Sequence, residues 1–107
     1  MTSAAGRDLV YHAIAHRTRR KIIDLLHRGG LPATEIAAKF SISQPAVSQQ
    51  LRVLLEADLL RAEAAGRQRI YRLNPERLRA VERWVSRAVA APSGHILVFR
   101  EANKKGA

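Results

Sequence analysis

The sequence predicts a mainly α-helical domain with one β-hairpin, in the order helix, helix, helix, helix, strand, strand, helix. Apolar residues recur at helical spacing in separate stretches, and two runs with strand character flank Gly66. Glycine and proline residues lie between the stretches, which indicates where the helices end and begin. With 107 residues, the chain has room for one domain with one core.

The first two helices are expected in the N-terminal third of the chain. Residues 8–16 carry apolar side chains at helical spacing, namely Leu9, Val10, Ala13 and Ile14. Thr18 is the expected cap of the second helix, and Gly29-Gly30 is its expected stop. Residues 1–7 precede the first periodic stretch and are expected to form a flexible N-terminus.

The third and fourth helices are expected to form a pair joined by a short turn at residues 41–43. Pro32 suits the first turn of the third helix, which should run to about Phe40. Ser43 is the expected cap of the fourth helix, with Pro45 in its first turn. The fourth helix is strongly amphipathic because its apolar residues recur at i, i+4, i+7 and i+8, as Val47, Leu51, Leu54 and Leu55.

Residues 59–63 and 69–73 predict two strands joined around Gly66. Asn74-Pro75 then opens the last helix, which should end near Pro92 and carries an apolar stripe of Leu78, Val81, Val85, Ala88 and Val89. The folded domain is therefore expected at residues 8–91, with residues 92–107 as a C-terminal tail or short added segment. The apolar run at 95–99 within that segment suits an added strand, a docking segment or a frayed tail.

The charge balance favours a polyanionic partner. Nineteen Lys and Arg residues against nine Asp and Glu residues give a formal net charge of +10. Nucleic acid fits best, because no apolar stretch approaches the roughly 18 residues that would span a bilayer. The first six residues also lack the apolar core of a signal peptide, so we expect a cytoplasmic protein. The absence of cysteine excludes disulfides, thiolate metal ligands and thiol switches.

Two short helices joined by a turn of about three residues, at residues 33–57, match the unit that inserts a recognition helix into the DNA major groove. The hairpin tip beyond it carries two arginines beside a glycine, which suits a wing that reaches the DNA backbone or minor groove. Each feature alone is also typical of an ordinary helical hairpin or a solvated turn. Together they predict a winged helix-turn-helix whose DNA-contacting residues are Ser43, Gln44, Pro45, Ser48, Gln49, Gln50, Arg52, Arg67, Gln68 and Arg69.

Gln50 departs from the pattern of the fourth helix. It lies at the edge of the apolar stripe, where a hydrophobic residue would be more usual. Its amide therefore needs water, phosphate or a backbone partner. A cluster of cations also stands out at the start of the second helix, where the helix dipole disfavours them, and a nearby phosphate would explain Arg17, Arg19, Arg20 and Lys21.

Over residues 9–89 the chain resembles the ArsR-type family of winged-helix transcriptional repressors. The resemblance rests on residues 14–23 (IAHRTRRKII), residues 42–54 (ISQPAVSQQLRVL) and the hairpin residues Gly66-Arg67 and Tyr71-Arg72-Leu73. It implies a dimer that binds an imperfect palindrome near a promoter and represses transcription. It also implies base contacts from Gln44, Ser48 and Gln49 and a wing contact from Arg67. Gln50 departs from the family pattern, because many members carry histidine there.

A dimer is expected to form through the first and last helices. Their apolar surface exceeds what two flanking helices of one small domain need. The expected interface residues are Leu9, Val10, Ala13, Ile14, Val81, Trp84, Val85 and Ala88.

We expect no metal site and no cofactor. His12 and His16 have the i, i+4 spacing of two metal ligands, but nothing nearby in the sequence supplies a third. Many members of the resembled family sense metals through cysteines on the third helix or through acidic and histidine ligands on the last helix. This chain departs at both places, with Pro32-Ala33-Thr34 at the first and Pro75, Arg77, Ala88 and Ala91 at the second.

Enzyme function is not expected, because the sequence contains no recognisable catalytic motif or glycine-rich phosphate loop. The alternative to a DNA-binding regulator is a winged-helix protein-interaction module with incidental affinity for nucleic acid, to which Val98-Phe99 would belong.

Overall fold

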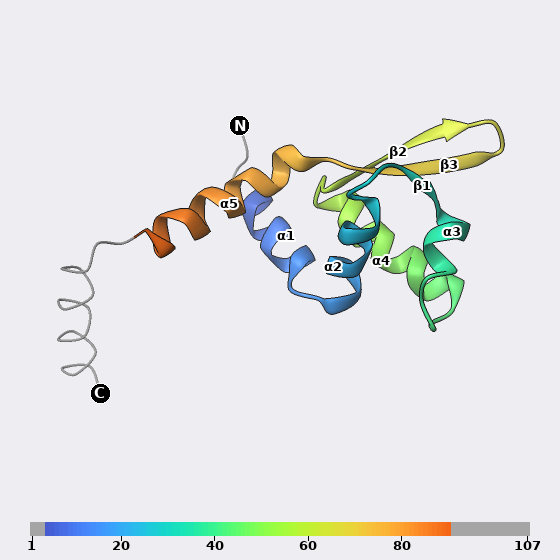
Figure 1. The fold of residues 1–107 in the computed structure, drawn as a ribbon, viewed down its shortest axis with the longest axis horizontal. Helices are drawn as coiled ribbons and strands as arrows, with labels where there is room; N and C mark the ends of the chain where they lie inside the picture. The colour runs from blue at the N-terminus through green and yellow to red at the C-terminus, as the bar shows by residue number, and fades with distance from the viewer. Residues whose placement is uncertain (1–3, 91–107) are drawn as a thin grey trace.

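The computed structural model describes residues 4–90. Its elements confirm the predicted mainly helical fold with a hairpin, and they add one short strand (Figure 1). In chain order they are α1 (Ala4–Ile14), α2 (Arg17–Leu26), β1 (Leu31–Pro32), α3 (Ala33–Ala37), α4 (Gln44–Glu56), β2 (Leu60–Ala65), β3 (Gln68–Leu73) and α5 (Pro75–Val89).

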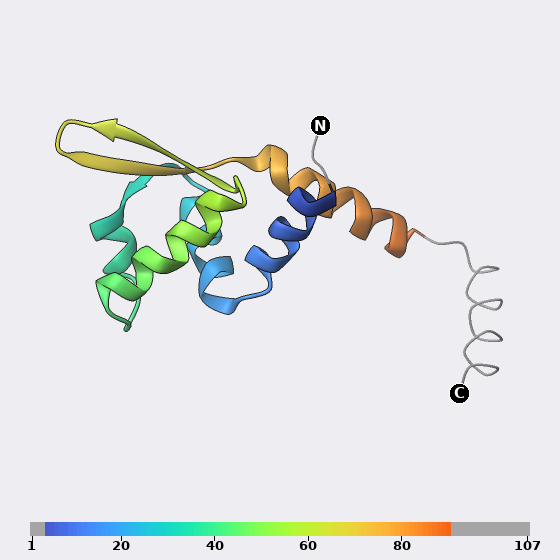
Figure 2. The same cartoon turned by 180° about the vertical axis from the view of Figure 1, so that it is seen from behind.

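The elements separate into two ends. The β2–β3 hairpin and α3 lie at one end, and α5 runs away from them beside α1 at the other (Figures 1 and 2). Between the two ends, α4 packs against α1, α2, α3 and β2. The predicted recognition unit and the predicted dimer helices therefore occupy different parts of the surface.

The core lies among α1, α2, α3, α4 and the base of the hairpin. Its largest fully buried side chains are Ile22, Leu26, Ile36, Val47, Leu51, Leu54, Leu59 and Leu60. Helix α5 contributes no buried residue, although Leu78 and Val81 pack against the core as half-buried side chains. One face of α5 is therefore left without a covering element among the described residues.

The hairpin closes through a two-residue loop, Gly66-Arg67, between Ala65 and its partner Gln68. Gly66 has φ +64° and is the first central residue of the turn, the position that a type II′ turn reserves for glycine. On the other side of β3, β1 forms an antiparallel pair at Leu31 with Tyr71. The sequence analysis missed β1 because two residues show no periodicity. Its Pro32 is tolerated because β1 is an edge strand.

Several expected helix boundaries were wrong. Helix α1 begins at Ala4, inside the segment expected to be flexible. The N-cap of α2 is His16 rather than Thr18, because the His16 Nδ1 atom accepts a hydrogen bond from the Thr18 backbone N–H at 3.2 Å. Helix α3 ends at Ala37 and continues to Phe40 only as a turn with i to i+3 hydrogen bonds. The expectations for Pro92 and for residues 92–107 lie outside the described residues.

The junction after α4 fixes where α5 begins. Asp58 adopts φ +58°, and its carbonyl accepts a hydrogen bond from the buried Asn74 side chain at 2.9 Å. The Asp58 carboxylate also pairs with Arg77 Nε at 3.0 Å. Because Asn74 is the N-cap residue of α5, these contacts attach the start of α5 to the end of α4.

Candidate nucleic-acid interface

Helix α4 presents one buried face and one exposed polar face. The predicted cap is confirmed, because Ser43 Oγ accepts a hydrogen bond from the Ala46 backbone N–H at 3.2 Å. Val47, Leu51 and Leu54 point into the core. The predicted DNA-contacting residues Gln44, Pro45, Ser48, Gln49 and Arg52 are all exposed. Their amides, hydroxyl and guanidinium are groups that hydrogen-bond base edges and phosphates.

The hairpin tip is also exposed, at Arg67, Gln68 and Arg69. The Arg69 guanidinium lies 6.0 Å from the centroid of the Tyr71 ring, at the outer limit of a cation–π contact. A shallow groove connects the tip to the start of α3, where Ala33 and Thr34 form its other wall. The fold thus brings the wing and the helix-turn-helix to one end of the molecule (Figure 1).

Gln50 is the one predicted DNA contact that is not fully exposed. It is half-buried, and its Oε1 atom accepts a hydrogen bond from Arg19 Nη1 at 2.8 Å. The sequence analysis expected a water, phosphate or backbone partner, so the side-chain partner was missed. The sequence did contain two signs of this contact, a polar residue on the apolar stripe of α4 and an unexplained cluster of cations in α2. Arg19 and Gln50 are 31 residues apart, so the sequence did not connect the two signs.

Comparison with known proteins agrees with this geometry. A family model described as a helix-turn-helix domain matches residues 14–63. The chain is 40% identical over 81 residues to the HTH-type transcriptional regulator Rv2034 of Mycobacterium tuberculosis, covering 76% of each chain. It is 38% identical to the transcriptional repressor SdpR of Bacillus subtilis, covering 71% of this chain and 84% of SdpR.

A solved structure gives the same assignment. It is the homodimeric winged helix-turn-helix DNA-binding domain of Mb0332 from Mycobacterium bovis, described as a possible ArsR-family transcriptional regulator. It superposes with a TM-score of 0.66 at 26% identity, covering 77% of this chain and 79% of that domain. The chain belongs to the ArsR-type family of winged helix-turn-helix transcriptional regulators. Membership makes it a DNA-binding regulator rather than an enzyme.

Two of the clustered cations of this ArsR-type regulator have a structural partner instead of a phosphate. Arg20 Nη1 donates to the Ile14 carbonyl at 2.8 Å, and Arg19 Nε donates to the Ala13 carbonyl at 2.7 Å. Both carbonyls belong to the last turn of α1, where the helix dipole is negative and favours cations. The phosphate explanation is therefore unnecessary for these two residues and applies at most to the exposed Arg17 and Lys21.

The predicted dimer residues divide into core and surface. Val10 and Ala13 are 3% and 0% exposed within the single chain, so they belong to the core and offer a partner almost no surface. Ile14 and Val81 are half-buried. We define the apolar face of this regulator as its exposed apolar residues on α1 and α5: Leu9, Trp84, Val85, Ala88 and Val89. Tyr11 borders the face, with its ring edge-on to Trp84 at a centroid distance of 6.1 Å.

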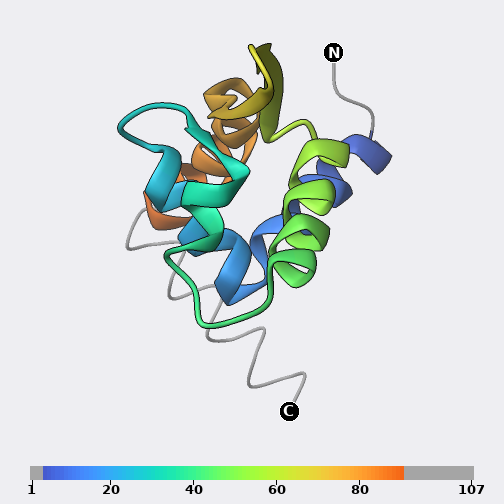
Figure 3. The ribbon, with the colours of Figure 1, turned by 90° about the vertical axis from the view of Figure 1, so that its right-hand side faces the viewer.

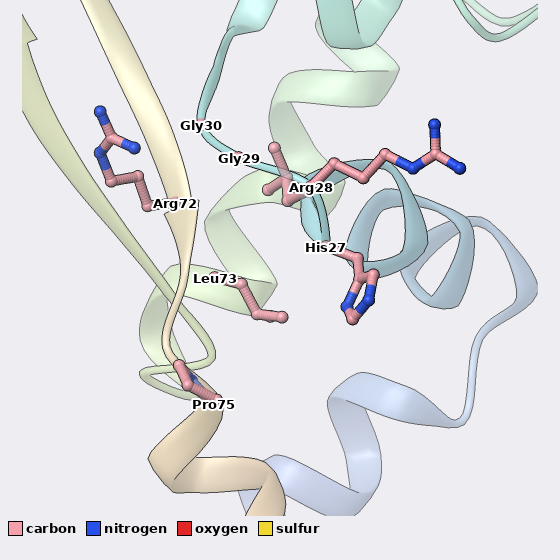
Figure 4. Close-up of a pocket in the computed structure, with 8 residues that line it drawn as sticks. His27, Arg28, Gly29, Gly30, Arg72, Leu73 and Pro75 are labelled. Atoms are coloured by element: carbon pink, nitrogen blue, oxygen red, sulfur yellow. The ribbon is translucent and has the colours of Figure 1, made fainter.

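A second groove lies between the end of α2, strand β3 and the start of α5 (Figure 4). The Arg28 and Arg72 side chains at its rim point away from each other. Arg72 is instead paired with Glu63. The groove therefore lacks convergent polar groups of the kind that hold a small ligand.

Within residues 4–90, no group of three or more His, Asp or Glu residues is arranged to hold a metal ion. His16 already uses Nδ1 as the cap of α2. In the same part of the chain, no helix has the length and apolar character needed to cross a membrane.

Proposed function

We propose that this regulator represses transcription by binding a near-palindromic operator as a homodimer. The related SdpR is a transcriptional repressor, and the related Mb0332 domain is a homodimer. A repressor of this type needs access to chromosomal DNA, so we assign it to the cytoplasm. The net charge of +10 supports a polyanionic partner.

The observation that carries this proposal is the shared exposure of α4 and the hairpin tip at one end of the molecule (Figure 1). In the proposed complex α4 enters the major groove, and Gln44, Ser48 and Gln49 hydrogen-bond base edges. Ser43, Pro45 and Arg52 lie against the neighbouring backbone. Arg67, Gln68 and Arg69 extend to the phosphates or the minor groove beside it.

The apolar face supplies the proposed dimer contact. Trp84 and Val89 are 54% and 80% exposed, which is unusual for side chains of this size in a small domain. Pairing two such faces about a two-fold axis would bury them and leave both recognition helices free. Two recognition helices in successive major grooves on one side of the duplex lie about 34 Å apart, which requires a near-palindromic site.

The test is selection from a library of duplexes with a random central segment, in the presence of excess non-specific DNA at physiological salt. We expect enrichment of a two-fold symmetric sequence. Protein that is retained on DNA with no sequence preference, or not retained at all, would support the protein-interaction module instead. A second test is sedimentation of the protein at micromolar concentration, which should show a dimer. A protein that is a monomer in free solution and also when bound to DNA would contradict the proposed assembly.

A further inference from the structure

Arg19 joins three helices through one buried guanidinium. The residue is 8% exposed and belongs to α2. Its Nε and Nη2 atoms donate to the Ala13 and His12 carbonyls at the end of α1, at 2.7 and 3.1 Å. Its Nη1 atom donates to Gln50 Oε1 on α4 at 2.8 Å. We call this set of hydrogen bonds the Arg19–Gln50 bridge.

The bridge gives Gln50 a structural task, because its Oε1 atom already accepts a hydrogen bond from Arg19. Arg19 forms no ion pair with a carboxylate among the described residues, so neutral oxygens alone satisfy its buried charge. Within residues 4–90, Gln50 Oε1 is the only side-chain oxygen to which Arg19 donates. Hydrogen bonds to a charged group are stronger than those between neutral groups, and a guanidinium presents its donors in a rigid planar fork, so the bridge holds both partners in one geometry.

The two ends of the bridge lie next to the two functional surfaces. On α4, Gln50 directly follows Ser48 and Gln49 on the exposed recognition face. On α1, the accepting carbonyls lie in the helix that also carries Leu9 of the apolar face. Helix α1 packs against both α4 and α5. Figure 3 shows α1 beside α4. The orientation of the recognition face relative to the apolar face therefore depends on how α4 is held to α1.

We propose that Gln50 is a positioning residue for sequence-specific DNA binding, acting through Arg19 to fix the angle between α4 and α1. This inference rests on the proposed function, because the angle matters only if two recognition helices must fit one operator. The bridge sets the separation and tilt of those helices across the dimer. Gln50 then determines specificity without contacting a base.

The first test is a double-mutant cycle on a duplex obtained by the selection described above. Gln50→Met removes the acceptor at nearly constant volume, and Arg19→Lys keeps the charge but loses the fork of donors. Each should lower specific affinity about tenfold, the effect of losing one hydrogen bond to a charged group, with non-specific affinity unchanged. The double variant should bind no more weakly than the weaker single variant, because both changes break the same bridge.

Losses that multiply in the double variant would overturn the proposal, because they would mean that Gln50 acts on DNA directly. Asp24→Asn, on the exposed side of α2, is the control and should leave affinity within twofold.

The second test needs no DNA. Residual dipolar couplings of the free protein report the orientation of α4 relative to α1. Gln50→Met should change that orientation, and Gln50→Glu should restore it, because a carboxylate oxygen can accept the same hydrogen bond from Arg19. An orientation that is unchanged in Gln50→Met would refute the bridge. A wild-type protein that selects no DNA sequence would refute the proposed function instead, and the couplings would still decide whether the bridge positions α4.

Discussion

At the scale of single residues, the exposed polar groups of α4 and of the hairpin tip have different tasks in the proposed complex. Gln49 has an amide that can both donate to and accept from one base edge. Arg67 carries a charge on a protruding turn, where it meets phosphates of any sequence. Base contacts determine sequence preference, whereas phosphate contacts position the protein.

We therefore expect Gln49→Ala to relax sequence preference. Loss of a bidentate base contact costs about 1–3 kcal/mol of discrimination. Arg67→Ala should weaken binding to all sequences and reduce the slope of log affinity against log salt by about one unit. Both values come from titrations of selected and scrambled duplexes at several salt concentrations. An unchanged specificity ratio for Gln49→Ala would show that the recognition face is assigned wrongly.

Binding should not respond to metals, arsenite or oxidants. The chain contains no cysteine, and His12 and His16 have no third ligand among the described residues. Duplex affinity measured with a chelator, and then with added zinc, copper, arsenite or peroxide, should vary less than tenfold, or about 1.4 kcal/mol of coupling. A larger metal-dependent change that disappears in His12→Ala would reveal a site built from that histidine pair.

At the scale of elements, the periodic helices and the hairpin could be predicted from the sequence, whereas features that depend on distant residues could not. Val47, Leu51 and Leu54 recur at helical spacing and are buried as expected. Strand β1 has no period to detect and exists only because β3 pairs with it. The Arg19–Gln50 bridge joins residues 31 apart. The polar Gln50 on an apolar stripe and the cation cluster that contains Arg19 could each be seen in the sequence, but their contact could not.

The capping of α4 is a prediction at this scale. Ser43→Ala removes the acceptor for the Ala46 N–H and should lower the free energy of unfolding by about 1 kcal/mol. Urea denaturation measures the change. Ser41→Ala is the matched control, since Ser41 lies in the same exposed turn without capping the helix, and it should change stability by less than about 0.5 kcal/mol. If the two variants lose the same free energy of unfolding, Ser43 does not stabilise α4 as its N-cap.

At the scale of the whole molecule, the proposed complex uses two separate surfaces, the apolar face for the dimer and the end with α4 and the hairpin tip for DNA. Their separation along the molecule allows one face to pair with a second copy while the other meets DNA (Figure 2). Sequence analysis pointed to the two helices that carry the exposed apolar face. It also included the buried Val10 and Ala13, because helical spacing cannot distinguish an exposed apolar residue from a core residue on the same stripe.

Val85→Glu should therefore weaken the dimer. Pairing the faces would desolvate the new carboxylate without a partner, so we expect the dimer dissociation constant to rise at least about tenfold. Ser86→Glu adds the same charge to the next residue of α5, away from the apolar face, and should have little effect. Sedimentation over a concentration series compares them. If Val85→Glu dimerises like the wild type, the dimer uses another surface.

Hydroxyl-radical footprinting on the selected duplex tests the central claim most directly. A homodimer with one recognition helix per chain should protect two half-sites, related by two-fold symmetry and centred about 10–10.5 base pairs, or a multiple of that spacing, apart. A single protected half-site, or two half-sites in direct repeat, would contradict the proposed two-fold dimer.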